Sequence, residues 1–308
     1  MKIAIQTGDI VDRLGLEKGY EAIRSTGFEA IDWNLDHAVK GSDLRKGDYK
    51  GKSILEKSLD SVKKHYEKEI DIINQNGLEI NQAHAPFPAY VRAYPDTLDY
   101  SIKILKRNIE FCDYVGCKNL VIHGIPYEMS DDVNTKEDIH KLNMKLYTSL
   151  IETAEKTGVT ICLENLFYTH NGVRYPGHCG DINEAVFDID YLNKVAGKDI
   201  FGFCLDTGHA NLLHQDFKVI IPKLGNRISC LHIHDNDGCS DMHMMPLTGT
   251  IDFTRFCSAM RDINFSKNLS FETFNQTNIV MAFDEELVLS FMKTIYDIGS
   301  VIRSKILG

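Results

Sequence analysis

Imidazole and carboxylate side chains gather behind a short apolar run in the last third of the chain. The segment RISCLHIHDNDGCSDMHMMPLTGTIDF covers residues 227–253, and residues 228–233 are predicted to form a strand. Its ligand-type residues are His232, His234, Asp235, Asp237, Asp241 and His243. Side chains two apart on a strand share a face, so His232 and His234 are expected to point the same way. Such a strand end is typical of the rim of a metal site, although a polar loop rich in Asp and His is the plain alternative.

Residues of the same kind follow other predicted strands. Short β-rich runs occur at residues 2–6, 30–34, 78–83, 119–124, 160–165, 201–207, 228–234 and 269–274. Polar or ligand-type residues at their ends are Trp33 to His37, His84, His123, Glu164, Asp206, His209, His232 and Glu272. A buried structural histidine explains any one of these positions but not their repetition. The pattern therefore predicts one site assembled from many strand ends, with Trp33 among the residues that contact a substrate.

Stretches with helical spacing separate these strands. Apolar residues recur every three or four positions at residues 59–73, 102–112 and 142–154, each stretch having a charged opposite face. Gly27, Gly77, Gly116 and Gly158 stand just past such stretches, where glycine can end a helix in the left-handed conformation. About eight alternating strand–helix units predict a (β/α)8 TIM barrel in a single domain, residues 1–308. An open doubly wound sheet is the alternative, but no GxGxxG or GxxxxGK(S/T) turn follows a strand.

The composition narrows the functional class. The chain has 308 residues and a formal charge of −10, with a pI near 5.6, which disfavours a broad nucleic-acid-binding surface. Its eight cysteines form no CxxC pair, and several lie in apolar runs, which indicates reduced and mostly buried thiols in a cytoplasmic protein. The N-terminal residues are not typical of a signal peptide, and no apolar run approaches membrane-spanning length.

Four of the ligand-type residues are expected to share one cation. Glu164, Asp206, His232 and Glu272 end the fifth to eighth predicted strands, which are neighbours in a barrel. Carboxylates with one imidazole make an oxygen-rich site suited to Mn²⁺, Mg²⁺, Co²⁺ or Zn²⁺. Pairing of the glutamates with basic residues at the rim is the alternative, but no basic residue stands beside them on these strands.

At these residues the chain resembles the xylose-isomerase-like TIM-barrel family, which contains sugar phosphate isomerases and epimerases. The resemblance rests on HAPFP at His84, VIHG at His123, CLENL at Glu164, CLDTGHAN at Asp206 and His209, LHIHDNDG at His232, DMHMMPLTGTIDF at Asp241 and His243, and SFETF at Glu272. It implies that Glu164, Asp206, His232 and Glu272 hold one divalent metal. His234 is the rival for the third ligand, although HIHD matches the family's H-x-(K/N)-D better with His232 in that place.

The same superfamily contains zinc DNA-repair enzymes similar to endonuclease IV. The resemblance implies that their additional zinc ligands correspond to His84, His123, His209, Asp241 and His243, and all five are present. Two departures count against a nuclease. The chain reads NLFYTHNGVRYPGHCG after the fifth strand, without a glycine-rich continuation, and PLTG after His243 in place of a GEG-type turn. We expect these five residues to contact substrate oxygens or to hold a second ion.

The resemblance implies a metal-dependent isomerase or epimerase of a sugar, sugar phosphate or related polyol. Glu164 and Glu272 are the expected proton-transfer pair, with the metal stabilising an enediolate. A dehydratase acting on an inosose-type substrate would use nearly the same residues. Two further candidate functions are an endonuclease IV-like phosphodiesterase acting on abasic DNA and a non-catalytic metal-binding barrel. The sequence leaves open which sugar is bound, whether it is phosphorylated, which metal is used, and whether the chain forms a homo-oligomer.

Two long segments on the catalytic side are expected to cover the site as loops. They are residues 36–53, after the second strand, and residues 167–180, after the fifth. The second contains Arg174, whose guanidinium is expected to bind the substrate, among aromatic residues and beside Gly172 and Gly177. Long loops in a compact barrel are typically functional, and an ordinary solvent-exposed excursion is the alternative.

Overall fold

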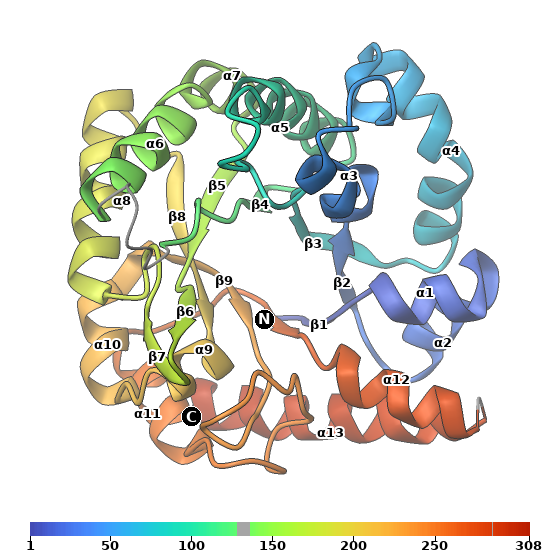
Figure 1. Cartoon of the computed structure of the whole chain (residues 1–308). Coiled ribbons are helices and arrows are strands. Elements are labelled where there is room, and N and C mark those ends of the chain that lie inside the picture. Colours follow the sequence, from blue (N-terminus) through green and yellow to red (C-terminus); the bar gives the residue numbers. More distant parts are fainter. Residues whose placement is uncertain (128–135, 285) are drawn as a thin grey trace. The chain divides into compact units, whose positions relative to one another are not determined.

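All eight predicted strands are present in the computed structural model, which describes residues 1–127, 136–284 and 286–308 (Figure 1). They are β1 (Ile3–Gln6), β2 (Ala30–Asn34), β3 (Glu79–His84), β4 (Asn119–Val121), β5 (Thr160–Glu164), β8 (Phe201–Asp206), β9 (Ile228–His232) and β10 (Leu269–Phe271). The pairings of β1 with β10 and β2, and of β4 with β3 and β5, are parallel. Their side chains are largely buried, as near-continuous apolar runs of a parallel sheet require.

The strand order follows the chain. Hydrogen bonds link the eight strands in the order β10-β1-β2-β3-β4-β5-β8-β9. Just beyond β9, the Ile233 amide donates to the carbonyl of Ser270 in β10 at 2.8 Å, and the Glu272 amide donates back to Ile233 at 3.0 Å. The order thus returns from β9 to β10 without the reversal of a doubly wound sheet, so the open-sheet alternative is wrong.

The chain divides into two compact units, and unit 1 comprises Met1–Trp33, Lys68–Asn81 and Cys204–Gly308. Its helices are α1 (Gly8–Leu14), α2 (Leu16–Ser25), the second half of α4 (Leu59–Gln75), α9 (Thr207–Leu212), α10 (Phe217–Leu224), α11 (Phe253–Asp262), α12 (Phe274–Phe283) and α13 (Leu287–Leu307), with the 3-10 turn η3 (Gly225–Arg227). Helix α11 packs against both α10 and α13 (Figure 1). Helix α13 approaches the strands at Gly299, where a Cβ atom would lie 2.8 Å from the Phe271 ring. Glycine at this position therefore permits the close helix–strand packing.

Unit 2 comprises Asn34–Glu67 and Gln82–Phe203. Its helices are the first half of α4, α3 (Gly41–Lys46), α5 (Thr97–Tyr114), α6 (Lys136–Thr148), α7 (Ile151–Thr157) and α8 (Ile182–Ala196), with η1 (Asp36–Ala38) and η2 (Ile54–Glu56). The predicted helical stretch at residues 142–154 is in fact split between α6 and α7. The hydroxyls of Thr148 and Ser149 donate to the carbonyls of Met144 and Lys145, each at 2.6 Å, and compete with the helical bonding at this point.

The predicted helix ends are confirmed at the four glycines. Gly27, Gly77, Gly116 and Gly158 have φ angles of 113°, 63°, 78° and 71°. Gly158 follows α7 directly in the left-handed conformation and donates its amide to the Ala154 carbonyl. A side chain with a Cβ atom adopts this backbone conformation only with strain, so glycine fixes where the helix stops.

The expectation of two long loops is wrong in part. Residues 167–176 form a β-hairpin of β6 (Phe167–His170) and β7 (Val173–Pro176), which pair antiparallel. Asn171 and Gly172 form its turn with φ angles of 49° and 76°, and an Asn-Gly turn between β-prone residues is a strong hairpin signal. Residues 36–53 contain η1 and α3 and are not a plain loop.

The composition predicted buried thiols and no membrane-spanning segment. None of the eight cysteines, all of which the structure describes, forms a disulfide, and seven of them are buried, with Cys239 exposed. Across the described parts of the chain, no helix combines the length and apolar character that crossing a membrane requires.

Candidate functional site

The predicted ligand-type residues lie in two groups, one within each unit. The group in unit 1 consists of Asp206, His209, His232, His234, Asp241, His243 and Glu272. The group in unit 2 consists of His84, His123 and Glu164. Each strand that contributes to them does so at its C-terminal end or just beyond it, where barrel enzymes place functional residues.

Three buried side chains at the ends of β8, β9 and β10 form the centre of the unit 1 group. Asp206 and His232 have no exposed surface, and Glu272 is 7% exposed. His232 Nδ1 lies 3.9 Å from Asp206 Oδ2 and 3.5 Å from Glu272 Oε2. These separations are longer than good hydrogen bonds, whereas ligands about 2.0–2.2 Å from a common ion lie roughly 3–3.5 Å apart. The Glu272 separation therefore fits two ligands of one divalent cation, whereas the Asp206 separation is longer than that range.

His234 contacts the same aspartate in a different way. Its Nε2 lies 3.0 Å from each carboxylate oxygen of Asp206, which is direct hydrogen-bond distance. Gly208 makes room for this ring, because a Cβ atom there would lie 2.0 Å from His234 Cε1. The His234 amide also donates to the Thr207 hydroxyl at 3.0 Å. This arrangement favours His232 as the ligand and His234 as the side chain that orients Asp206.

A second trio in unit 1 consists of His209, Asp241 and His243. Asp241 Oδ2 lies 3.1 Å from His243 Nε2 and 3.6 Å from His209 Nε2. Burial opposes ionisation of Asp241, but hydrogen bonds from the two histidines hold the pKa of this carboxyl well below its usual range. Burial likewise opposes charging of His243, yet the carboxylates of Glu272 and Asp241 raise its pKa above the ordinary value. Ligand atoms of the trio all lie within 4.8 Å of one another, so it too could hold a cation.

The unit 2 group is arranged around Glu164 at the end of β5. Its side chain is 1% exposed, and His123 Nε2 lies 2.8 Å from Glu164 Oε2. The ring of His84, from the end of β3, lies edge-on to His123 with centroids 6.1 Å apart. Ligand atoms of these three residues also lie within 4.8 Å of one another, so the structure brings these three of the predicted residues together.

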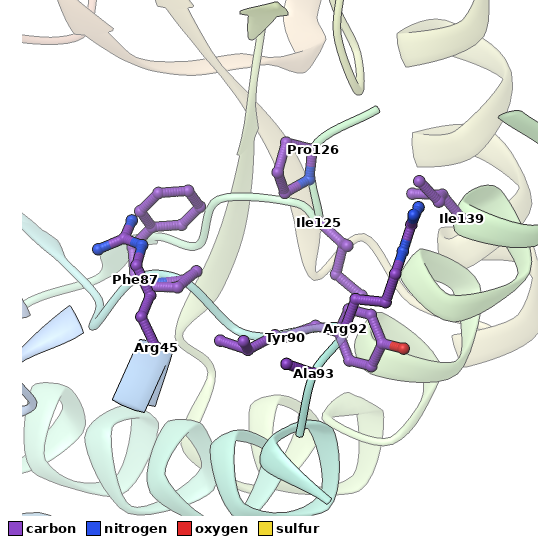
Figure 2. A pocket seen from close by; sticks show the side chains of 10 residues that line it. Arg45, Phe87, Tyr90, Arg92, Ala93, Ile125, Pro126 and Ile139 are labelled. Atoms are coloured by element: carbon purple, nitrogen blue, oxygen red, sulfur yellow. The ribbon is translucent and has the colours of Figure 1, made fainter. Parts of the chain in front are cut away.

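A cavity of about 300 Å³ adjoins this group within unit 2. Phe87, which lines it, packs edge-on against His123 with ring centroids 5.1 Å apart. Figure 2 shows Arg45 beside Phe87 at one end and Arg92 beside Ile139 at the other. The described residues that line it include two arginines and no acidic side chain. Phe87 belongs to the HAPFP segment, but no sequence motif marked Arg45 or Arg92.

Trp33 and Arg174 were predicted to contact a substrate, and in the structure both side chains contact other residues of the protein. Trp33 is 2% exposed, and its indole donates to Glu69 Oε1 at 3.0 Å. Arg174 lies over the Phe167 ring at 5.4 Å and donates to the Thr169 hydroxyl across the hairpin. These contacts brace the surrounding structure, and a role in substrate binding stays a prediction for both residues.

We expect Arg174→Ala to lower kcat/KM by roughly tenfold or more, the loss of about 1.4 kcal/mol of transition-state stabilisation, with unchanged metal content. Steady-state kinetics on the true substrate, with metal analysis, would test this. Thr169→Val is the matched control, because it removes the hairpin partner of Arg174 and keeps the guanidinium. If both variants lose activity equally, the guanidinium acts only by bracing the hairpin.

Asp235 has a positioning role that the sequence did not reveal. This buried carboxylate accepts hydrogen bonds from the amides of Leu247, Gly249 and Ile251 at 3.0–3.1 Å. Its own backbone pairs with Met244 in both directions at 2.9 Å. Asp235 thus fixes the segment of residues 236–251, which carries Asp241 and His243. Because Asp235 follows His234 directly, the sequence suggested that it is a metal ligand. In the structure its carboxylate oxygens instead accept hydrogen bonds from backbone N–H groups.

Comparisons with known proteins bear on the family and the fold. A family model described as xylose isomerase-like TIM barrel matches residues 20–293, which confirms the predicted barrel fold. An inosose isomerase of Bacillus subtilis is 27% identical over 201 residues, covering 63% of this chain and 67% of that protein. A probable endonuclease 4 of Mycoplasma genitalium is 26% identical over 196 residues, covering 59% of this chain and 61% of that protein. A crystal structure of an L-ribulose 3-epimerase has a TM-score of 0.68 at 19% identity, covering 99% of this chain and 96% of that one.

Proposed function

Because this chain belongs to the xylose isomerase-like TIM-barrel family, we propose that it is a divalent-metal-dependent isomerase or epimerase of a sugar, sugar phosphate or related polyol. The observation that carries the proposal is the buried set of Asp206, His232 and Glu272, in which His232 Nδ1 lies 3.5 Å from Glu272 Oε2 and 3.9 Å from Asp206 Oδ2. The likeness to an inosose isomerase and to sugar epimerases supports a small polyhydroxylated substrate. The net charge of −10 speaks against DNA as the substrate.

The proposed metal ligands are Asp206, His232, Glu272 and Glu164. Support for Glu164 is that β5, which it ends, precedes β8 and β9 in the hydrogen-bonded strand order. Such an oxygen-rich set suits Mn²⁺, Mg²⁺, Co²⁺ or Zn²⁺. When bound, the ion would supply positive charge that stabilises negative charge developing beside a substrate carbonyl.

The proton transfers are assigned to two glutamates. One removes a proton from the carbon next to the carbonyl, and the other returns a proton, either to the opposite face or to the neighbouring carbon. Gln6 Nε2 donates to Glu272 Oε1 at 3.1 Å and so fixes that carboxylate. His123 Nε2 lies 2.8 Å from Glu164 Oε2, an ion-pair contact without hydrogen-bond geometry. Each proton carrier therefore has a polar side chain beside its carboxylate.

The cavity beside His123 is proposed to receive the end of the substrate away from the reacting carbon. Phe87 and Ile125 offer apolar surface to carbon atoms, and the guanidinium groups of Arg45 and Arg92 suit an anionic group. A phosphorylated substrate would use both features. Comparing each ketose with its phosphate, and wild type with Arg45→Ala, would separate the two substrate classes.

Turnover in deuterated water tests the proposed reaction. Ketoses, ketose phosphates and inososes would be incubated with the protein and Mn²⁺, Co²⁺, Mg²⁺ or Zn²⁺, and the products followed by NMR. We expect deuterium to enter beside the carbonyl of one substrate, only with metal and not in the Glu272→Gln variant. Loss of water from an inosose would indicate the dehydratase instead. No exchange and no product with any of these substrates would contradict the proposal.

A zinc phosphodiesterase is the second candidate, and one observation favours it. Two further trios, His84–His123–Glu164 and His209–Asp241–His243, offer ligand sets beyond a single ion. The similarity to a probable endonuclease 4 points the same way. Three zinc ions at these oxygen- and nitrogen-donor residues, together with cleavage of abasic DNA, would favour this candidate over the isomerase.

A further inference from the structure

Unit 2 contains another set of metal-ligating side chains that the proposed function does not use. It consists of His178 and Cys179, which precede α8, together with Asp188 in α8 and His140 in α6. His178, Cys179 and Asp188 have no exposed surface, and the His140 side chain is 31% exposed. Buried groups of this kind require partners, because burying a charge or a polar atom without one is costly.

The polar atoms of these four residues make one short hydrogen bond and two longer contacts. His140 Nε2 lies 2.9 Å from Asp188 Oδ1, which is an ordinary hydrogen bond. In contrast, His178 Nε2 lies 3.5 Å from Asp188 Oδ2 and 3.6 Å from Cys179 Sγ. Around a tetrahedral Zn²⁺, with bonds of about 2.0–2.3 Å, nitrogen–oxygen and nitrogen–sulfur separations are roughly 3.4 and 3.5 Å. The 3.5 Å contact with Asp188 thus matches two ligands of one ion better than a hydrogen bond, and the 3.6 Å separation from Cys179 suits either two ligands of one ion or a hydrogen bond to sulfur.

The donors are held in place by the surrounding structure. The ring of His178 stacks on Tyr147 with centroids 5.6 Å apart, and a Cβ atom at Gly124 would lie 2.2 Å from its Nδ1. Cys179 has a φ of 57°, a strained value for a residue with a side chain. Strain of this kind persists where the surrounding structure enforces it, as it does at ligand sites.

The charges of these side chains also favour a bound cation. The carboxylate of Asp188 has no exposed surface and faces the imidazoles of His140 and His178. These two imidazoles are the ion-pair partners that the described residues give it. With the thiol of Cys179 deprotonated, the two anionic ligands would balance the charge of one divalent ion. A thiolate, an imidazole and a carboxylate together suit zinc.

We propose that His178, Cys179 and Asp188 bind a structural Zn²⁺ ion, with the fourth position taken by water. His140 holds the remaining oxygen of Asp188 and so orients this ligand. Binding releases the proton of the Cys179 thiol to solvent, and no electron transfer is involved. The site is distinct in its donors from the proposed catalytic centre, whose assigned ligands are carboxylates and imidazoles.

Cobalt substitution gives a readout that only a thiolate ligand produces. The protein is stripped of metal with a chelator and titrated with Co²⁺, and absorption from thiolate-to-cobalt charge transfer is followed in the near ultraviolet. We expect the band in the wild type and in Asp206→Asn, and its loss in Cys179→Ser. The control is Cys204→Ser, which removes another buried cysteine and should keep the band. In parallel, Asp188→Asn should weaken zinc binding by at least tenfold.

The outcomes separate this site from the proposed function. A wild-type protein without the band would overturn the zinc site, and this result does not depend on whether any variant folds. A band that persists in Cys179→Ser, or that disappears in Cys204→Ser or Asp206→Asn, would place the cobalt elsewhere and overturn it too. Failure of the isomerase assay leaves the cobalt result unaffected, since no substrate is used.

Discussion

Glu164→Gln, Asp206→Asn, His232→Ala and Glu272→Gln are each expected to abolish turnover and to weaken retention of the catalytic metal. Each change removes a charge or a lone pair from a buried side chain that is proposed to hold the ion. A loss of activity of at least a thousandfold corresponds to about 4 kcal/mol of transition-state stabilisation. Metal content by atomic emission, measured beside activity, is the test. Full metal occupancy in any two of the four variants would refute the shared site.

Two matched variants sharpen this test. Asp237→Asn changes an exposed carboxylate of the same segment and should leave metal content and turnover unchanged. His234→Gln removes a hydrogen-bond partner of Asp206 but no proposed ligand, so the ion should bind 10–100-fold more weakly with unchanged stoichiometry. If the His234→Gln variant loses the metal while the His232→Ala variant binds it normally, then His234 is the ligand and His232 is the residue that orients Asp206.

Asp235→Ala is expected to lower the free energy of unfolding by more than about 3 kcal/mol, because it leaves three backbone N–H groups without their charged acceptor. These are the amides of Leu247, Gly249 and Ile251. Urea unfolding of the metal-free protein followed by circular dichroism measures the effect without interference from bound ions. Activity should fall as well, since Asp241 and His243 lie on the segment that these bonds hold.

The control for this prediction is Asp237→Ala. Asp237 accepts from the amides of Cys239 and Ser240 in an exposed turn, where water can replace the lost acceptor. Asp237→Ala should therefore lower the free energy of unfolding by less than about 1 kcal/mol. Equal effects of the two substitutions would mean that Asp235 does not hold the segment as its contacts indicate.

The strands were predictable because parallel strands buried on both faces are nearly continuous apolar runs. The predicted run at residues 30–34 coincides with β2, and that at 160–165 exceeds β5 by one residue. The glycines at the helix ends then fixed the intervals between strands. Ligand-type residues at the strand ends could be found for the same reason, since each follows directly on an apolar run.

Other features depend on contacts between residues far apart in the chain. His140 and Asp188 are 48 positions apart and meet only because α6 packs against α8. The three bonds to the Asp235 carboxylate from Leu247, Gly249 and Ile251 exist only after residues 236–251 have folded back on it. The hairpin at residues 167–176 is a different case, because its Asn-Gly turn is a local signal that the expectation of a plain loop overlooked.

The close approach of His234 to Asp206, which Gly208 permits, also fixes where a proton resides. An ionised carboxylate only accepts hydrogen bonds, so the Nε2 atom that lies 3.0 Å from both of its oxygens must carry hydrogen. The neutral imidazole is then the Nε2–H tautomer, and that nitrogen has no lone pair to offer an ion. With Asp206 ionised, His234 Nε2 is therefore a hydrogen-bond donor to this carboxylate and not a ligand of an ion.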